Sequence, residues 1–414
     1  MSLADLYGRT EEKIILQKHI DEKNPLIVVS GLRRIGKTSL VMSVLNSLDH
    51  SIYLNVWDIG ATSKITKEQV MELFEHGIQK FFDSHKKITN QLISFLQSVA
   101  GISVNASVAG TGGGGSIQFH PPDKSEVTLV SLFSGLNDWA IENEQIITIA
   151  IDEVQEFSKS IDIDLAKFFS SFYNYENIVL ILTGSQVGLL YNFINKEDSQ
   201  SPFYGKDIVP LKIEPLSEDE SKGFLLKAFE EEGSIKIQRI IPYDQIIDEA
   251  SKELGGIIGW LVNFGLECVR NGRITEESII NTQETGAVQV RDEFNKFIYG
   301  TSDSEKFNQI MRALTNLTSF DFDCFIKEQK YEKFLQKLEY NGFLKSDSKK
   351  RYFFSDPLLA HSFLKEYHGS EESENKMPKK KKPTPSKKKP KKKTVVKKKP
   401  TPSKKKPKKK KRTK

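Results

Sequence analysis

A phosphate-binding loop is the first chemistry that this sequence indicates. The pattern GxxxxGK(S/T) falls within a run of ten consecutive residues: Gly31, Leu32, Arg33, Arg34, Ile35, Gly36, Lys37, Thr38, Ser39 and Leu40. Glycines let the backbone wrap tightly, so that successive N–H groups can point at phosphate oxygens. The pattern predicts that this loop binds a nucleotide, that Lys37 reaches its β- and γ-phosphates, and that the Thr38 hydroxyl binds Mg²⁺.

The sequence around this loop supports the same interpretation. An apolar run at residues 26–29 predicts a buried strand before it, and residues 39–48 predict a helix after it. Strand, loop and helix in this order form the setting of a phosphate site, with the helix N-terminus adding its positive dipole end. The alternative is a chance turn that carries glycine and lysine.

Polar residues end two further apolar runs, where a P-loop needs partners. Residues 146–151 lead into Asp152 and Glu153. We expect Asp152 to hold Mg²⁺ and Glu153 to deprotonate the attacking water, although a pair of acids can also cap a helix. Residues 178–182 lead into Thr183 and Ser185, either of which could hold that water. A simple turn remains the alternative for these two residues.

The apolar runs predict the fold class. Strands expected at 26–29, 51–56, 146–151, 178–182 and 208–213 are near-continuously apolar, as in a parallel sheet with helices on both faces. The predicted core is therefore an α/β P-loop NTPase, with further helices at 11–20, 65–98, 126–142 and 162–172.

Two other motifs are weaker. In residues 102–119, apolar residues recur at alternate positions on both sides of a glycine run at 110–115, which predicts a hairpin. A second phosphate-binding loop is rejected, because neither a lysine nor the start of a helix follows these glycines. Residues 195–198 match the guanine-reading NKxD motif, but they follow a helical stretch where that motif follows a strand. ATP is therefore favoured over GTP.

Charge divides the chain into an acidic body and a basic tail. The formal net charge of the 414 residues is +6, whereas that of residues 376–414 is +23, so residues 1–375 have a net charge of −17. The two cysteines, Cys268 and Cys324, predict neither a disulfide framework nor a metal site. No apolar run suits a signal peptide or a membrane span, and the expected location is cytoplasmic, or nucleoid-associated if the chain binds DNA.

Residues 217–295 look entirely helical, and residues 303–367 predict a winged helix. Three helices, at 304–315, 321–329 and 331–340, precede two short strands whose connection carries Lys349, Lys350 and Arg351. The third helix could enter a major groove while this wing contacts phosphates. Many winged helices contact only protein, and this alternative stays open.

The tail repeats itself. Residues 380–393 recur as residues 397–410, and this density of proline and lysine predicts a disordered arm. Non-specific binding of duplex DNA or other nucleic acid through Lys379–Lys414 is the favoured role, because lysine is a point charge without sequence readout. Folding back on the acidic body, an acidic partner and an anionic membrane are the alternatives.

Six segments, taken in order, resemble the archaeal ATPases of the STAND/AAA+ type, relatives of the origin-recognition and loader ATPases. They are residues 7–9 (Tyr-Gly-Arg), 31–40, 151–157, 182–185, 201–205 and 255–261. The resemblance covers about residues 5–367. It implies an ATPase core, a helical lid and a C-terminal winged helix, with predicted boundaries 1–215, 216–298, 299–368 and, for the tail, 369–414.

The resemblance also assigns further site residues. It implies that Gly8, Arg9 and Ile258 lie near the adenine, and that Lys206 is a γ-phosphate sensor or finger. Three positions depart from the family pattern: Thr10 replaces Glu, Lys206 replaces Arg, and Ile258 replaces the Pro of Gly-x-Pro. Lysine cannot make arginine's planar bidentate contact.

These observations predict a Mg²⁺-dependent ATPase switch that a basic arm holds on nucleic acid. Two alternatives remain: a non-catalytic, nucleotide-gated scaffold that recruits protein partners, and an architectural DNA-coating protein with a vestigial ATPase. The protein partner, the oligomeric state and the source of any arginine finger are left open.

Overall fold

The computed structural model describes residues 7–60, 64–84, 104–106, 117–119, 126–160, 164–185, 194, 198–231, 243–299 and 301–364. All of them belong to one compact unit, Met1–His368. The basic tail, the glycine run 110–115 and most of the NKxD string lie outside the described residues.

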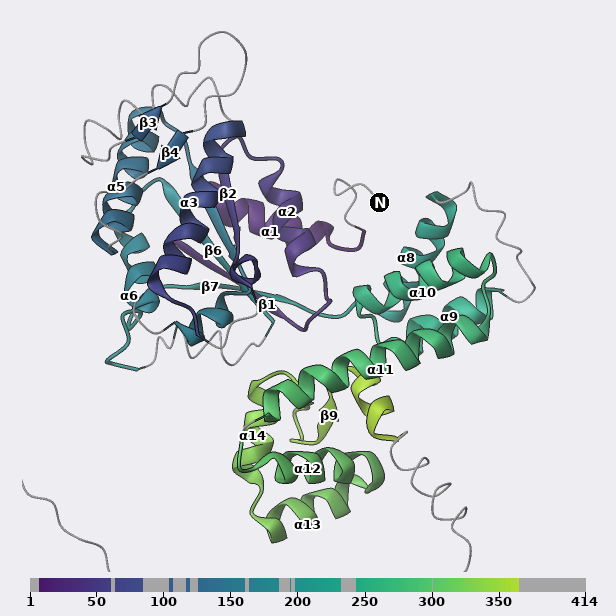
Figure 1. Cartoon of the computed structure of the whole chain (residues 1–414). Helices are drawn as coiled ribbons and strands as arrows, with labels where there is room; N and C mark the ends of the chain where they lie inside the picture. The colour runs from purple at the N-terminus through teal and green to yellow at the C-terminus, as the bar shows by residue number, and fades with distance from the viewer. Residues whose placement is uncertain are drawn as a thin grey trace, which may run out of the picture. The chain divides into compact units, whose positions relative to one another are not determined.

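A five-stranded parallel sheet forms the centre of the core (Figure 1). Its strands are β1 (Leu26–Gly31), β2 (Ser51–Asn55), β5 (Ile147–Asp152), β6 (Ile178–Gly184) and β7 (Val209–Ile213), in the spatial order β2-β5-β6-β1-β7. The register pairs Asn55 with Asp152 and Ser30 with Gly184, so these carboxyl ends share one edge. The predicted parallel sheet is confirmed.

Helices cover both faces of this sheet, as the near-continuous apolar strands predicted. Along β1, Ile27 and Val29 pack with α1 (Thr10–Asp21) and α2 (Lys37–Leu45). The alternate residues Leu26 and Val28 pack with the opposite layer. That layer consists of α3 (Lys67–Ser84), α5 (Glu126–Glu142) and α6 (Leu165–Ser170).

Short irregular elements complete the core. The strands β3 (Val104–Ala106) and β4 (Ile117–Phe119) pair antiparallel, as predicted for the hairpin. The described part of the core also contains three 3₁₀ segments: η1 (Val56–Ile59), η2 (Val154–Lys159) and η3 (Ser171–Asn174). The helix expected at 162–172 is shorter, because α6 ends at Ser170 and its chain tightens into η3.

Helices dominate the rest of the unit. They are α8 (Glu218–Glu231), α9 (Tyr243–Glu253), α10 (Ile258–Asn271), α11 (Glu276–Ile298), α12 (Ser304–Asn316), α13 (Ser319–Gln329) and α14 (Glu332–Tyr340). An antiparallel pair, β8 (Leu344–Ser346) and β9 (Tyr352–Phe354), follows α14, and residues 357–364 are helical. This order of three helices and a hairpin agrees with the expectation for residues 303–354; its identity as a winged helix stays a prediction.

One buried hydrophobic cluster crosses two of the predicted domain boundaries. It joins Leu16 on α1 and Trp260 on α10 to Phe334 on α14 and Phe363 near the end of the described residues. The division at residues 215 and 298 therefore stays a prediction.

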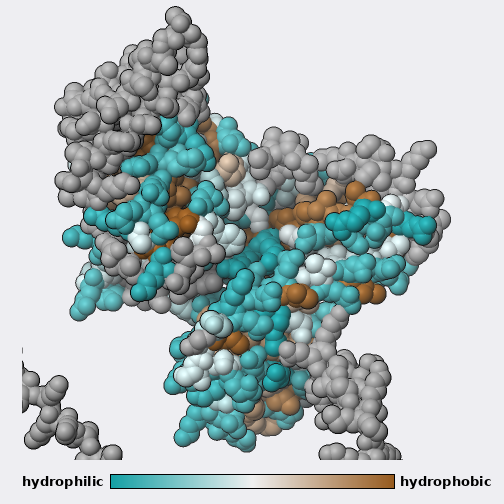
Figure 2. Space-filling model, in the orientation of Figure 1, coloured by the Kyte–Doolittle hydropathy of each residue, from teal (hydrophilic) through white to brown (hydrophobic). Residues whose placement is uncertain are grey.

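Figure 2 shows a mainly hydrophilic surface over α11–α13 with small separate hydrophobic patches. None of the described helices has the length and apolar character that crossing a membrane requires.

Candidate functional site

The P-loop turn depends on close backbone packing between β1 and α2. A Cβ atom on Gly31 would lie 2.5 Å from the carbonyl oxygen of Ile213 on the neighbouring strand. Gly36, which precedes α2, has φ of +96°, and Arg34 has φ of +62°. Glycine adopts such backbone angles readily, whereas an L side chain adopts them at some cost. The predicted glycine positions therefore have a structural reason here.

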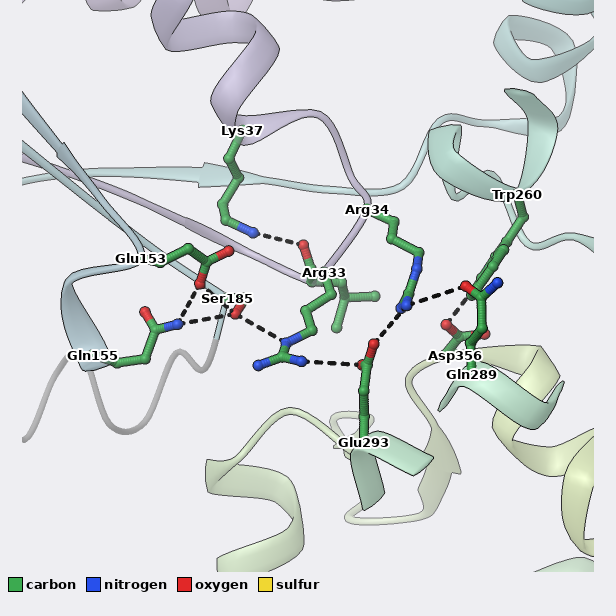
Figure 3. Close-up of polar contacts among 11 residues, drawn as sticks. Arg33, Arg34, Lys37, Glu153, Gln155, Ser185, Trp260, Gln289, Glu293 and Asp356 are labelled. Atoms are coloured by element: carbon green, nitrogen blue, oxygen red, sulfur yellow. Dashed lines mark hydrogen bonds and ion pairs between the residues drawn. The ribbon is translucent and has the colours of Figure 1, made fainter. Parts of the chain in front are cut away.

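Lys37 is buried and folds back over the loop (Figure 3). Its Nζ donates hydrogen bonds to the carbonyl oxygens of Leu32 at 2.8 Å and Gly31 at 3.1 Å. Burial lowers the pKa of this lysine, while the nearby carboxylates of Glu153 and Asp152 act in the opposite direction. The ammonium group is thus held within the loop that was predicted to bind phosphate.

Asp152 collects three hydroxyl groups at the end of β5. Oδ2 accepts hydrogen bonds from Thr38 Oγ1 at 2.6 Å and from the Tyr53 hydroxyl at 2.8 Å, while Oδ1 accepts one from Thr183. Burial, followed by the charge of Asp152, raises the pKa of Tyr53 well above its ordinary value, so this phenol remains a donor. The structure therefore brings together both predicted magnesium ligands, Thr38 and Asp152.

These ligands fit a magnesium ion in kind but are few. Mg²⁺ prefers oxygen ligands and is usually held by one or two protein groups plus substrate phosphates and water. Within the described ranges, no cluster of three His, Cys, Asp or Glu side chains could hold a metal alone. The Thr38–Asp152 pair thus suits an ion that arrives with a nucleotide.

Glu153 is fixed by two polar side chains. Ser185 Oγ donates a hydrogen bond of 2.9 Å to Oε2 of Glu153, and the Gln155 amide donates to the same oxygen. The amide also donates to Ser185 at 3.2 Å. The backbone of Glu153 is in the left-handed region, with φ of +57°, and its N–H donates to Thr183 Oγ1 at 3.3 Å. The predicted residues Thr183 and Ser185 thus both lie in the network of the two carboxylates.

The two P-loop arginines contact α11. Arg33 Nε donates to Ser185 Oγ at 3.3 Å, and its NH1 lies 3.4 Å from Oε2 of Glu293. Arg34 NH2 lies 2.5 Å from Oε1 of the same carboxylate. Figure 3 shows Glu293 between the two guanidinium groups. The P-loop is therefore tied to a helix more than 250 residues later in the chain.

The N-terminus of α10 packs directly on the P-loop. The N–H of Gly259 donates to the Arg34 carbonyl at 2.8 Å, and a Cβ on Gly36 would lie 3.3 Å from Ile258 Cδ1. Ile258 thus lies beside the P-loop, and its predicted position near the adenine stays a prediction. The Arg34 guanidinium stacks on the Trp260 ring with 4.4 Å to its centroid.

Trp260 connects this junction to the C-terminal elements. Its indole Nε1 donates a hydrogen bond of 3.0 Å to Oδ2 of Asp356. Burial raises the pKa of the Asp356 carboxyl to about 6, although hydrogen bonds from Trp260 and the Leu358 N–H oppose this rise. A buried acid with a perturbed pKa therefore lies one side chain away from the P-loop.

Arg9 and Gly8 support the loop from the other side. The Arg9 guanidinium is buried and donates to the carbonyl oxygens of Ile35 at 3.2 Å and Glu214 at 2.7 Å. Gly8 has φ of +73° and packs on Leu216. These contacts hold the P-loop in place; the predicted role of Gly8 and Arg9 at the adenine stays a prediction.

Lys206 lies outside the network of the other site residues. Its Nζ donates to the Ser170 carbonyl at 2.6 Å and lies 4.6 Å from the centroid of the Tyr173 ring. Burial lowers the pKa of this lysine. In this conformation the ammonium group contacts Ser170 and Tyr173, and its γ-phosphate role stays a prediction. Lys349, Lys350 and Arg351 are exposed on the connection between β8 and β9, with Arg351 paired to Asp347 at 2.7 Å.

A cleft with a volume of about 910 Å³ opens beside Arg33, Gln155 and Ser185. Its opposite wall comes from α11 and α14 and includes Lys296 and Lys337. The end of α14 approaches the site closely, because a Cβ on Gly342 would lie 3.7 Å from the Ser185 carbonyl oxygen. The C-terminal elements thus face the candidate catalytic residues.

The residues whose side chains connect different elements of the site were not predicted from the sequence. They are Tyr53, Gln155, Trp260, Glu293 and Asp356. A partial signal existed for Tyr53, which lies on a predicted strand, and for Gln155, two residues after Glu153. No local pattern distinguishes Glu293 from the other acids of α11.

The comparisons with known proteins agree with this geometry. A family model described as an ATPase domain predominantly from Archaea matches residues 7–263. The chain is similar to a Walker-type ATPase of Pyrococcus abyssi, with 25% identity and a TM-score of 0.68, over 87% of this chain and 96% of that one. It also shares its fold with the ORC2 protein of Aeropyrum pernix, determined in ADPNP–ADP complexes, with 12% identity and a TM-score of 0.52 over 90% of this chain and 96% of that one. No curated protein matches the chain.

Proposed function

The chain belongs to the family of ATPase domains that occur predominantly in Archaea, and on this premise we propose that it is a Mg²⁺-dependent ATP hydrolase that works as a nucleotide switch. The observation that carries this proposal is the convergence of Lys37, Asp152 and Glu153 at one edge of the sheet. They come from segments more than 100 residues apart, and parallel strand register brings them together.

The contacts of Lys37 and Glu153 are compatible with phosphate binding and proton transfer, respectively. The Lys37 ammonium exchanges the carbonyls of Gly31 and Leu32 for β- and γ-phosphate oxygens. Glu153, held by Ser185 and Gln155, accepts the proton of the attacking water. Holding the base in place beforehand raises the reaction rate, because the carboxylate need not be oriented during the reaction.

Thr38 and Asp152 would hold the magnesium ion. When bound, such an ion neutralises charge on the β- and γ-phosphate oxygens. The Thr38 hydroxyl would offer the ion an oxygen lone pair while its O–H continues to donate to Asp152 Oδ2, and Thr183 would continue to orient the other oxygen.

We include nucleic-acid association in the proposal. The support is the charge of +23 over residues 376–414, together with exposed Lys349 and Lys350 between β8 and β9. A dense run of lysines releases counterions from nucleic acid without reading its sequence. Hydrolysis would change the contacts between α10, α11 and the P-loop and so the position of the C-terminal elements.

Two variants of the full chain test the hydrolase. Lys37→Ala is expected to lose nucleotide binding, whereas Glu153→Gln is expected to bind ATP and turn it over at least about 100-fold more slowly. Normal turnover by Glu153→Gln would exclude this residue as the base. Addition of duplex DNA across a salt series, with and without residues 369–414, tests whether the tail couples DNA to turnover.

A non-catalytic, nucleotide-gated scaffold is the second candidate. The observation that favours it is Lys206, whose ammonium group is committed to the Ser170 carbonyl and the Tyr173 ring. This candidate predicts nucleotide binding with negligible turnover in wild type, and no effect of DNA. Lys206→Ala then leaves nucleotide affinity unchanged, whereas a γ-phosphate sensor would lose affinity for the triphosphate.

A further inference from the structure

We propose that Glu293 is a positioning residue that competes with the terminal phosphate of a nucleoside triphosphate for Arg33, and so links the γ-phosphate to α11. The inference rests on the proposed nucleotide-binding function and goes beyond it by naming the group that the phosphate displaces. It assigns the P-loop arginine and its lid carboxylate a role in telling triphosphate from diphosphate.

The placement of Arg33 carries the first step. Its Nε and the carboxylate of Glu153 both bond to one atom, Ser185 Oγ, at 3.3 Å and 2.9 Å. A base that deprotonates the attacking water must lie next to the γ-phosphate. Arg33 shares the partner Ser185 with that base (Figure 3), and we therefore place it on the γ-phosphate side of the loop.

The second step is that Glu293 already occupies Arg33. The carboxylate lies 3.4 Å from Arg33 NH1 and 2.5 Å from Arg34 NH2, and all three side chains are about three-quarters covered. Guanidinium groups bind phosphate and carboxylate in the same planar, charge-assisted manner. One group therefore replaces the other when a terminal phosphate reaches Arg33.

The two arginine side chains have different contacts. Arg33 contacts the Glu153 network, whereas Arg34 stacks on Trp260 and contacts Gln289 and Glu293 without a bond to Ser185. A phosphate that draws Arg33 away leaves Glu293 held by Arg34 alone. The connection between P-loop and α11 weakens when triphosphate binds and returns with diphosphate, which lacks the competing group.

This exchange has a measurable signature in nucleotide preference. Removing the negative charge of Glu293 frees Arg33 for the γ-phosphate, so affinity for a triphosphate rises while affinity for ADP stays the same. The coupling between two such sites is typically fivefold or more. A purely structural role for Glu293 would change both affinities together.

The experiment is calorimetric titration of the full chain with Mg²⁺ and either adenylyl imidodiphosphate, which resists hydrolysis, or ADP. Glu293→Gln is expected to raise the affinity ratio of the triphosphate analogue over ADP by about fivefold or more. Glu293→Asp, which withdraws the carboxylate, is measured in the same way and changes the ratio in the same direction.

Three further variants serve as controls. Glu267→Gln removes a carboxylate of α10 that pairs with Arg270 at 2.7 Å but not with the P-loop, and leaves the ratio unchanged. Arg33→Gln lowers the ratio, and adding Glu293→Gln to Arg33→Gln has no further effect.

The outcomes separate the inference from the proposed function. A wild-type chain that binds neither nucleotide overturns both. A wild-type chain that binds both, with Glu293→Gln changing the two affinities equally, overturns the inference alone. An effect of Glu293→Gln that persists without Arg33 overturns it as well.

Discussion

The hydroxyl of Tyr53 and the hydroxyl of Thr38 bond to the same oxygen of Asp152, at 2.8 Å and 2.6 Å. One comes from β2, the other from the start of α2, and the acceptor ends β5. The predicted magnesium ligands therefore have a third partner, Tyr53, that orients the carboxylate.

Tyr53→Phe is expected to weaken the affinity for magnesium rather than nucleotide binding. Groups that orient a metal ligand typically contribute 10- to 100-fold in metal affinity, so the Mg²⁺ concentration for half-maximal ATP turnover should rise by about tenfold. Tyr175→Phe is the matched control, since its hydroxyl donates to the Val130 carbonyl on the other side of the core. Equal effects of the two variants would show that Tyr53 has no specific role at Asp152.

Asp356 predicts a pH dependence of stability. Its pKa is raised from 3.8 to about 6 in the folded protein, chiefly by burial. The folded state then holds its proton up to higher pH than the unfolded state, so this group's stabilisation is complete below pH 4 and is lost as pH rises through about 6. Asp356→Asn removes this loss while keeping a carbonyl oxygen for the Trp260 indole.

The comparison of the two chains isolates this group. Between pH 5 and pH 7, Asp356→Asn should gain about 1 kcal/mol in the free energy of unfolding relative to wild type. Urea unfolding of both chains at several pH values measures the difference, because all other carboxyl groups are shared. A pH-independent difference would contradict the raised pKa.

Gly256→Ala is expected to destabilise the junction between the core and α10. Gly256 has φ of +69°, and a Cβ there would lie 1.9 Å from the carbonyl oxygen of Leu216. Gly272→Ala is the matched control, with φ of +65° and no atom within 4 Å of the added Cβ. The control should cost about 1 kcal/mol from backbone strain, and Gly256→Ala clearly more in thermal or urea unfolding. Similar losses would mean that the backbone moves aside.

The tail predicts a graded salt dependence of nucleic-acid binding. Residues 397–414 hold 12 of the 23 cations counted from residue 376, so ending the chain at residue 396 removes about half of the charge. Each phosphate contact adds about 0.9 to the log–log salt slope, so the slope should fall by about half, and for residues 1–368 to the small value that Lys349 and Lys350 can supply. Fluorescence anisotropy with duplex DNA measures it, and an unchanged slope would place the contacts elsewhere.

The sequence predicted the elements of the site better than their connections. Lys37, Thr38, Asp152 and Glu153 were predictable because each follows an apolar strand, and parallel strands place their carboxyl ends at one edge. The three helices and hairpin at residues 304–354 were predictable from apolar periodicity and from Asn341-Gly342, where Gly342 has φ of +77°. Both signals are local.

Contacts between distant segments left no such signal. Glu293 meets Arg33 and Arg34 only because α11 packs across the P-loop, and Asp356 meets Trp260 only because the C-terminal elements pack on α10. A charged residue on an exposed helix face has the same local pattern whether or not a partner approaches it. The family resemblance assigned Lys206 a phosphate contact; its ammonium group bonds to the Ser170 carbonyl in this structure, and the phosphate role stays a prediction.

The buried cluster that joins Leu16, Trp260, Phe334 and Phe363 limits how far any switch can travel. Detaching the C-terminal helices would expose a continuous apolar surface, at roughly 25 cal/mol for each Å². Small rotations about joints such as Gly255–Gly256 avoid that cost, because both residues have the backbone freedom of glycine. The fold therefore permits small rotations of the C-terminal helices while they stay packed on the core, and it opposes their complete detachment.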